Sequence, residues 1–230
     1  MTALPFHASD APPNSGLLKG LSQGEVDVVL AAAKPRRFPS KCLITHQGGR
    51  ADHLLLLWKG RARYFIETPK GKRLNLIWIT PGQIFGATAL VSQPSTYLAA
   101  TEAVRDSTVL IWDGPIIRAL AQRFPTLLEN VFLTSVDYLS WYVATHAALT
   151  SENARERLAH VLLGYAPSIG QRTSSGIELD VTNEELANAT NISLYTTSRI
   201  VSEWHRTGLI CKRHKKILLR CPESFFHKAT

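Results

Sequence analysis

A run of seven residues near the C-terminus carries side chains that suit the reading of nucleic-acid bases. It reads SLYTTSR over positions 193–199. An arginine can donate two hydrogen bonds to O6 and N7 of guanine, and serine and threonine hydroxyls can reach bases or phosphates. A tyrosine can offer its hydroxyl to a phosphate or its ring to a thymine methyl group. The residues that we expect to contact DNA in this run are Ser193, Leu194, Tyr195, Thr196, Ser198 and Arg199.

Basic residues gather directly after this run. Positions 199–220 hold seven lysines and arginines against one acidic residue, Glu203, which gives a net charge of +6 within 22 residues. The stretch 208–221 predicts a strand, a basic turn and a second strand. Cations at the tip of such a turn suit contacts with phosphate groups, which supply a large share of the affinity for DNA. The residues expected at this tip are Lys212, Arg213, Lys215 and Lys216, with His214 between them.

Two short helices joined by a tight turn are expected to position the 193–199 run. Thr182 followed by Glu185 forms a capping box, so a first helix begins directly after Thr182. Asn191 falls at the joint, where an asparagine tolerates the left-handed backbone of a sharp turn. Ser193 caps the second helix and Gly208 ends it. This is the pattern of a helix-turn-helix, whose second helix places its N-terminal residues in the major groove.

The first half of the chain has the pattern of a domain built from short strands. Residues 61–67 alternate basic with apolar or aromatic side chains, as expected of a half-buried strand, and residues 68–71 suit a tight turn. Further strands are expected over 73–79 and 107–113, and a helix capped by Ser22 precedes them. Many short strands with turns between them predict a sandwich or a barrel.

A long helix beginning at Pro125 is expected between these two parts. Bulky positions recur along it at alternating spacings of four and three, a heptad seam that suits pairing with a second copy of the chain. Its opposite side also carries large residues, so the helix would pack on its own strands as well. A helix packed only within its own domain is the alternative. The seam residues expected at a dimer interface are Leu128, Phe132, Leu139, Tyr142, His146 and Leu149.

Composition and the absence of catalytic patterns narrow the class of function. The chain has 230 residues, 45% hydrophobic and 19% charged, and its net charge of +8 is compatible with a nucleic-acid partner. Its longest apolar run, over 54–58, is far too short to cross a membrane. Residues 1–16 lack the pattern of a secretory signal, so a cytoplasmic location is expected. No H-x-H pair, G-x-S-x-G elbow or glycine-rich phosphate loop is present, so we expect no enzyme activity, metal site or cofactor.

The order of these elements resembles the Crp/Fnr family of bacterial transcription regulators. The resemblance spans about residues 17–222 and is strongest over 181–210, VTNEELANATNISLYTTSRIVSEWHRTGLI. It implies an α+β fold with an N-terminal double-stranded β-helix, a jelly-roll-like effector domain, followed by a long dimerisation helix and a C-terminal winged helix-turn-helix. It also implies a homodimer, a palindromic site in double-stranded DNA and RNA polymerase as a partner. The domains expected on this basis are a flexible tail over 1–16, the roll over 17–124, the dimerisation helix over 125–149 and the DNA-binding domain over 150–230.

The roll departs from the family members that bind cyclic AMP. Those members carry Gly-Glu and then Arg-Ser, and the resemblance places these pairs at Gly86-Ala87 and near Tyr97-Leu98. The carboxylate for the ribose and the guanidinium for the phosphate are both missing, and a buried phosphate without a cation is badly unpaired. We therefore expect that cyclic AMP does not control the protein in the usual way and that its effector is unknown. The residues expected to line an effector pocket are Gly86, Ala87, Tyr97, Leu98 and Tyr142.

The recognition run departs from the family as well. Tyr195 stands where glutamate is common, and glutamate accepts a hydrogen bond from a cytosine amino group. We therefore expect a DNA half-site that is altered at that step. The alternative function is a ligand-sensing roll whose C-terminal module serves assembly rather than DNA binding. Arg199 and the basic turn argue against that alternative.

Overall fold

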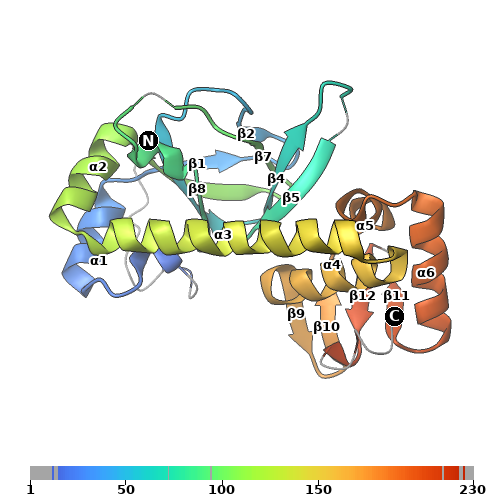
Figure 1. Ribbon diagram of the computed structural model, residues 1–230. Coiled ribbons are helices and arrows are strands. Elements are labelled where there is room, and N and C mark those ends of the chain that lie inside the picture. Colours follow the sequence, from blue (N-terminus) through green and yellow to red (C-terminus); the bar gives the residue numbers. More distant parts are fainter. Residues whose placement is uncertain are drawn as a thin grey trace. The chain divides into compact units, whose positions relative to one another are not determined.

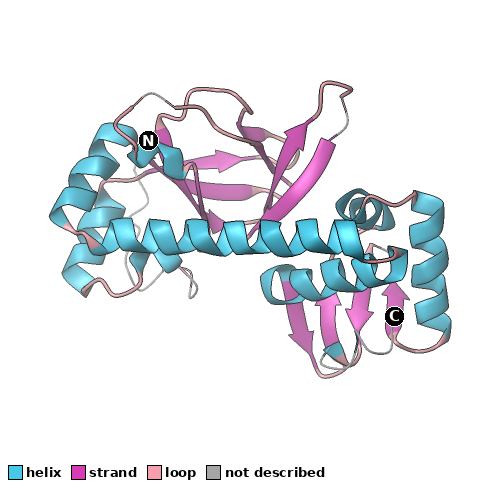
Figure 2. Cartoon of the chain, in the orientation of Figure 1, coloured by secondary structure: helices cyan, strands magenta, loops and turns pink. Residues whose placement is uncertain are grey.

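The computed structural model describes Pro12, residues 15–71, 73–93, 95–213 and 215–222, and Phe225. The flexible tail expected over 1–16 therefore falls largely outside the described residues. Contacts divide the chain into two compact units, Met1–Lys72 with Ile79–Leu139 and Arg73–Trp78 with Ser140–Thr230. Figure 1 labels their helices and strands, and Figure 2 separates helix from strand by colour. No described helix combines the length and apolar character needed to span a membrane.

The first half of the chain is rich in strands, as its sequence predicts. The expected strands over 73–79 and 107–113 are present as β5 and β8, and the Ser22 capping box at the start of α1 is confirmed. The elements are η2 (Gly16–Leu18), α1 (Gln23–Ala31), β1 (Lys34–Phe38), β2 (Leu43–Thr45), β3 (His53–Lys59), β4 (Ala62–Glu67), β5 (Arg73–Ile79), β6 (Ile84–Phe85), η3 (Ala87–Leu90), β7 (Ala100–Ala103), β8 (Ser107–Asp113), α2 (Gly114–Arg123) and α3 (Thr126–Ser151).

These strands form two four-stranded sheets. One has the order β1-β8-β3-β6 and the other the order β2-β7-β4-β5. In the first sheet β3 pairs antiparallel with β8, in a register that places Leu55 opposite Ile111. Apart from the consecutive strands β4 and β5, neighbours in each sheet are not consecutive in the sequence, which is the crossover pattern of a jelly roll.

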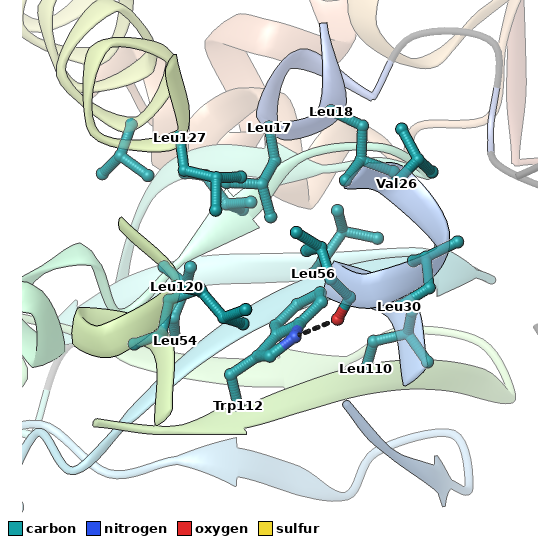
Figure 3. Packing of buried hydrophobic residues seen from close by; sticks show 14 residues of the cluster. Leu17, Leu18, Val26, Leu30, Leu54, Leu56, Leu110, Trp112, Leu120 and Leu127 are labelled. Atoms are coloured by element: carbon teal, nitrogen blue, oxygen red, sulfur yellow. Dashed lines mark hydrogen bonds between the residues drawn. The ribbon is translucent and has the colours of Figure 1, made fainter. Parts of the chain in front are cut away.

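A cluster of apolar side chains packs the first sheet against helices on its face. Figure 3 shows leucines of η2, α1, β3, β8 and α2 around Trp112, which is fully buried. Trp112 Nε1 donates a hydrogen bond to the carbonyl oxygen of Val29 at 2.8 Å, the dashed line in the figure. Val29 lies in the last turn of α1, where carbonyl groups lack partners within the helix. The indole therefore fills the core and also satisfies the end of α1.

The second unit carries the expected helix-turn-helix and a four-stranded sheet of order β11-β12-β10-β9. The serine, glycine and proline content of residues 167–176 predicts a loop, and that prediction is wrong for 167–173. Residues up to Ile169 continue a helix, and 170–173 pair with a strand, because sheet pairing outweighs local composition. The elements are α4 (Ala154–Ile169), β9 (Gly170–Thr173), β10 (Gly176–Leu179), α5 (Asn183–Thr190), α6 (Leu194–Arg206), β11 (Ile210–Arg213) and β12 (Lys216–Leu219).

Candidate nucleic-acid interface

The turn between α5 and α6 has the geometry that the sequence predicts. Thr182 and Glu185 form the capping box of α5, and Asn191 takes the left-handed conformation at φ +51°. Ser193 caps α6: its Oγ accepts a hydrogen bond from the Thr196 backbone nitrogen at 3.0 Å and lies 2.9 Å from Thr196 Oγ1. The hydroxyls of Ser193 and Thr196 are thus engaged with each other, and their direct role is to hold the start of α6.

The inner face of α6 is anchored in the second unit. Ile200, Val201 and Trp204 are buried, and the Trp204 ring packs edge-to-face on Phe225 with centroids 5.2 Å apart. Thr197 is fully buried although it is polar, and its hydroxyl donates to the Ser193 carbonyl oxygen at 3.1 Å. This hydrogen bond explains why a threonine is tolerated at an inward position.

The outer face of α6 is presented to solvent. Tyr195, Arg199, Ser202 and Arg206 are all exposed and recur at spacings of four, three and four, which places them on one side of the helix. Ser198, beside this face, is half-buried, and its Oγ accepts a hydrogen bond from the Asn183 side chain at 3.0 Å. The sequence did not reveal this contact between the two helices.

The basic turn forms a hairpin between β11 and β12, and β11 lies beside α6 (Figure 1). Lys212, Arg213 and Lys215 are exposed at its tip, and Lys215 takes the left-handed conformation at φ +55°. His214 lies outside the described residues. We call this hairpin, residues 210–219, the wing.

A carboxylate that the sequence analysis missed neutralises part of the wing. Glu178 on β10 lies 2.5 Å from Lys216 Nζ and 3.5 Å from Arg213 Nη1. Its side chain is 13% exposed, so these ion pairs are better shielded than most surface pairs. Lys212 and Lys215 therefore remain the more available cations of the four expected at the tip.

A second ion pair ties α6 to α4. The Arg155 guanidinium pairs with the Glu203 carboxylate. The hydrogen bond from Arg155 is the main cause that lowers the pKa of Glu203 below its ordinary value of 4.5, and the charges of Arg155, Arg206 and Arg199 act in the same direction. Glu203 thus belongs to a network that fixes the recognition helix on its domain.

The residues expected to line an effector pocket are only partly brought together. Gly86 has φ +78°, and a Cβ there would lie 2.5 Å from the His53 carbonyl oxygen and 3.0 Å from the Tyr97 ring. Tyr97 is buried, and its hydroxyl donates to that carbonyl at 3.2 Å. Burial is the main cause that raises the pKa of Tyr97; the hydrogen bond to His53 opposes it, and the charge of Asp52 adds to it.

Leu98 does not share this buried position. Leu98 is 75% exposed, and half-buried Tyr142 belongs to the second unit. A pocket of about 360 Å³ does open in the first unit, near the start of α2. In its lining, Arg50 pairs with Asp52 at 2.7 Å, His53 lies 3.2 Å from Asp113, and Arg118 donates a hydrogen bond to the Ala89 carbonyl oxygen at 2.7 Å.

Two family models match the chain. The model of the cyclic nucleotide-binding domain matches residues 35–124, and that of the Crp-like helix-turn-helix domain matches residues 156–224. The chain belongs to the Crp/Fnr family of transcription regulators. Its α5–α6 unit is accordingly the helix-turn-helix of a DNA-binding domain, and the regulators of this family are not enzymes.

Individual relatives agree with this membership. The Cyclic AMP receptor protein of Thermus thermophilus is 28% identical to this Crp/Fnr regulator over 196 residues, which cover 85% of this chain and 88% of the relative. The crystal structure of a CRP-family transcriptional regulator, also from Thermus thermophilus, matches with a TM-score of 0.70 at 26% identity, over 84% of this chain and 96% of that one. A CooA mutant from Carboxydothermus hydrogenoformans shares the fold, with a TM-score of 0.75 at 20% identity over 95% and 96% of the two chains.

The cyclic nucleotide that the first family model implies does not fit the residues of this Crp/Fnr regulator. At the first of the two family positions, Ala87 offers no carboxylate for a ribose. A Cβ on the neighbouring Gly86 would lie 3.0 Å from the Tyr97 ring. At the second family position, Tyr97 carries no positive charge. Its hydroxyl is already hydrogen-bonded to a backbone carbonyl. A cyclic phosphate buried there would have no cation at either position.

The long helix α3 of this Crp/Fnr regulator has two apolar faces, as the sequence predicts. Leu127, Val131 and Ala148 are buried on one face. The other face is a stripe of exposed apolar side chains at spacings of four, four, three and four, from 40% to 67% exposed. We call it the α3 stripe: Leu128, Phe132, Val136, Leu139 and Val143. Of the expected seam residues outside it, His146 and Leu149 are exposed and Tyr142 is half-buried.

Proposed function

We propose that this Crp/Fnr regulator binds a two-fold palindromic DNA site as a homodimer. Each copy would place the start of α6 in a major groove and the wing on the adjoining phosphates. The two recognition helices would then lie about one duplex turn apart, roughly 34 Å. RNA polymerase is the further protein partner that the family resemblance suggests.

The α3 stripe is the observation that carries the homodimer. Five large apolar side chains exposed along one helix are unfavourable in water, and pairing with the same stripe of a second copy would bury them all. Their spacing is that of helices that pack side by side. A symmetric pair of chains would present two identical recognition helices, which matches a palindromic site.

Analytical ultracentrifugation tests the homodimer. It is run on the protein alone and on the protein with duplexes that carry one or two half-sites. We expect two chains per palindromic duplex. Leu139→Asp should produce monomers with at least tenfold weaker binding to the palindrome, because a carboxylate would be buried at the stripe. Asp137→Lys, at an exposed α3 position off the stripe, should leave the dimer intact. A monomeric wild-type chain, or a Leu139→Asp variant that still dimerises fully, would contradict the proposal.

We also propose that cyclic AMP does not control this regulator in the usual way of the family. Tyr97 beside Gly86, without a carboxylate or a guanidinium at the two family positions, supports this proposal. The affinity for DNA should be the same with and without cyclic AMP. A large gain in affinity on adding cyclic AMP would reject this part of the proposal.

A further inference from the structure

Two large apolar side chains stand exposed at the start of the recognition helix. Leu194 is 53% exposed and Tyr195 is 79% exposed. Among the described residues of the second unit, the other exposed large hydrophobic side chains are Val143 and Leu149, and both lie on α3. The pair at the start of α6 is therefore separate from the proposed dimer seam and needs another partner.

The cap of α6 fixes the backbone that carries this pair. Leu194 and Tyr195 directly follow the cap residue Ser193, whose side chain binds the Thr196 backbone nitrogen. The first turn of α6 is thereby closed, so both side chains project from a rigid helix end. Arg199, one turn further on, is exposed on the same side of the helix as Tyr195.

The chemistry of these side chains selects among the base edges of the major groove. Neither carries the carboxylate that accepts from a cytosine amino group, nor the amide that forms two hydrogen bonds with adenine. The C5-methyl group of thymine is the apolar feature of that groove, and apolar side chains contact it. We infer that the DNA half-site presents thymine methyl groups to Leu194 and Tyr195, next to a guanine contacted by Arg199. This inference rests on the proposed function and states which bases the site reads.

Removal of single methyl groups from the DNA tests this inference. Duplexes that bind the full-length protein are first selected from random sequence, and each thymine of the selected half-site is then replaced by uracil. Uracil differs from thymine only in lacking the methyl group, so the hydrogen bonds of the base pair stay the same. We expect a loss of about fourfold in affinity at each of two positions, as for one buried methyl group. Uracil in the flanking sequence should have no effect.

Variants of the protein assign each methyl group to a side chain. Leu194→Ala should abolish the uracil effect at one position and Tyr195→Ala at the other. Tyr195→Phe should keep the effect, because the ring rather than the hydroxyl makes the contact. Ser202→Ala is the matched control, since Ser202 is exposed on the same face two turns further along α6. That variant should respond to uracil as the wild type does.

The outcomes separate this inference from the proposed function. A selected half-site that binds well but tolerates uracil at every thymine would overturn the inference and leave DNA binding by a homodimer standing. A Tyr195→Phe variant as weak as Tyr195→Ala would overturn it for Tyr195, because the hydroxyl would then be the contact. Failure to bind any duplex in a salt-dependent way would instead reject the proposed function.

Discussion

The side-chain amide of Asn183 donates a hydrogen bond to Ser198 Oγ at 3.0 Å. The contact joins the first residue of α5 to the recognition helix α6, fifteen residues further along the chain. Because Ser198 Oγ accepts this bond, its own hydroxyl hydrogen is left to donate elsewhere. Asn183 thus sets both the orientation of Ser198 and the hydrogen-bonding character that it presents beside the reading face.

Loss of this contact should weaken recognition of the specific DNA site. We expect Asn183→Ala to lower the affinity for the selected palindrome about fivefold, since one hydrogen bond contributes about 1 kcal/mol. The affinity for random duplex should not change. Fluorescence anisotropy with labelled duplexes measures both. Asn188→Ala, a half-buried position of the same helix, serves as the control, and an equal effect of the two variants would show that Asn183 has no special role.

Release of the wing cations from Glu178 should strengthen binding to DNA of any sequence. Glu178→Gln removes the negative charge that Lys216 and Arg213 share. We expect about threefold tighter binding to random duplex at low salt and a steeper dependence on salt, because more phosphates can be neutralised. Glu129→Gln changes the net charge equally on the first unit and should have a smaller effect. Equal or weaker binding by a folded Glu178→Gln variant would contradict this account of the wing.

The Arg155–Glu203 ion pair should stabilise the DNA-binding domain in a pH-dependent way. The pKa of Glu203 in the folded protein is lowered from 4.5, chiefly by Arg155, so its contribution is present at neutral pH and disappears as the pH falls through the lowered pKa. We expect Glu203→Gln to lower the melting temperature at neutral pH, with the difference from wild type shrinking as the pH falls through the lowered pKa of Glu203. Thermal unfolding followed by circular dichroism measures it. Glu184→Gln, at an exposed position of α5, should leave the melting temperature unchanged, and a pH-independent effect of Glu203→Gln would argue against the ion pair.

The Trp112 indole should be a major contributor to the stability of the first unit. Trp112→Phe removes buried ring volume and leaves the Val29 carbonyl at the end of α1 without its donor. Both effects destabilise, and together we expect a loss of about 2–4 kcal/mol in the free energy of unfolding, measured by urea denaturation. A loss below about 0.5 kcal/mol would mean that α1 does not depend on this contact.

Features set by neighbouring residues could be predicted from the sequence. The capping boxes at Ser22 and Thr182 and the left-handed turn at Asn191 each depend on a few consecutive residues, and the structure confirms all three. The strand over 61–67, present as β4, and the two apolar faces of α3 follow from periodicity. These local signals were sufficient to predict the helix-turn-helix and the exposure of Tyr195 and Arg199.

Features set by residues distant in the sequence could not be predicted in this way. Glu178 reaches the wing through the pairing of β10 with β12, and Arg155 reaches Glu203 through the packing of α4 on α6. Neither carboxylate–cation pair has a local signal. The expected seam passes through Tyr142, whereas the α3 stripe passes through the neighbouring Val143 and through Val136. The two differ because a helix of 3.6 residues per turn drifts from a strict heptad.

One measurement tests most directly whether α6 reads the DNA. It compares the affinity for the selected palindrome with the affinity for random duplex, for wild type and for Arg199→Lys, over a range of salt concentrations. Lysine keeps the charge of Arg199 but cannot form the two parallel hydrogen bonds to guanine. We predict that binding to random duplex stays the same and that the preference for the palindrome falls about tenfold or more. A preference that is unchanged in Arg199→Lys would contradict the assignment of α6 as the helix that reads the DNA.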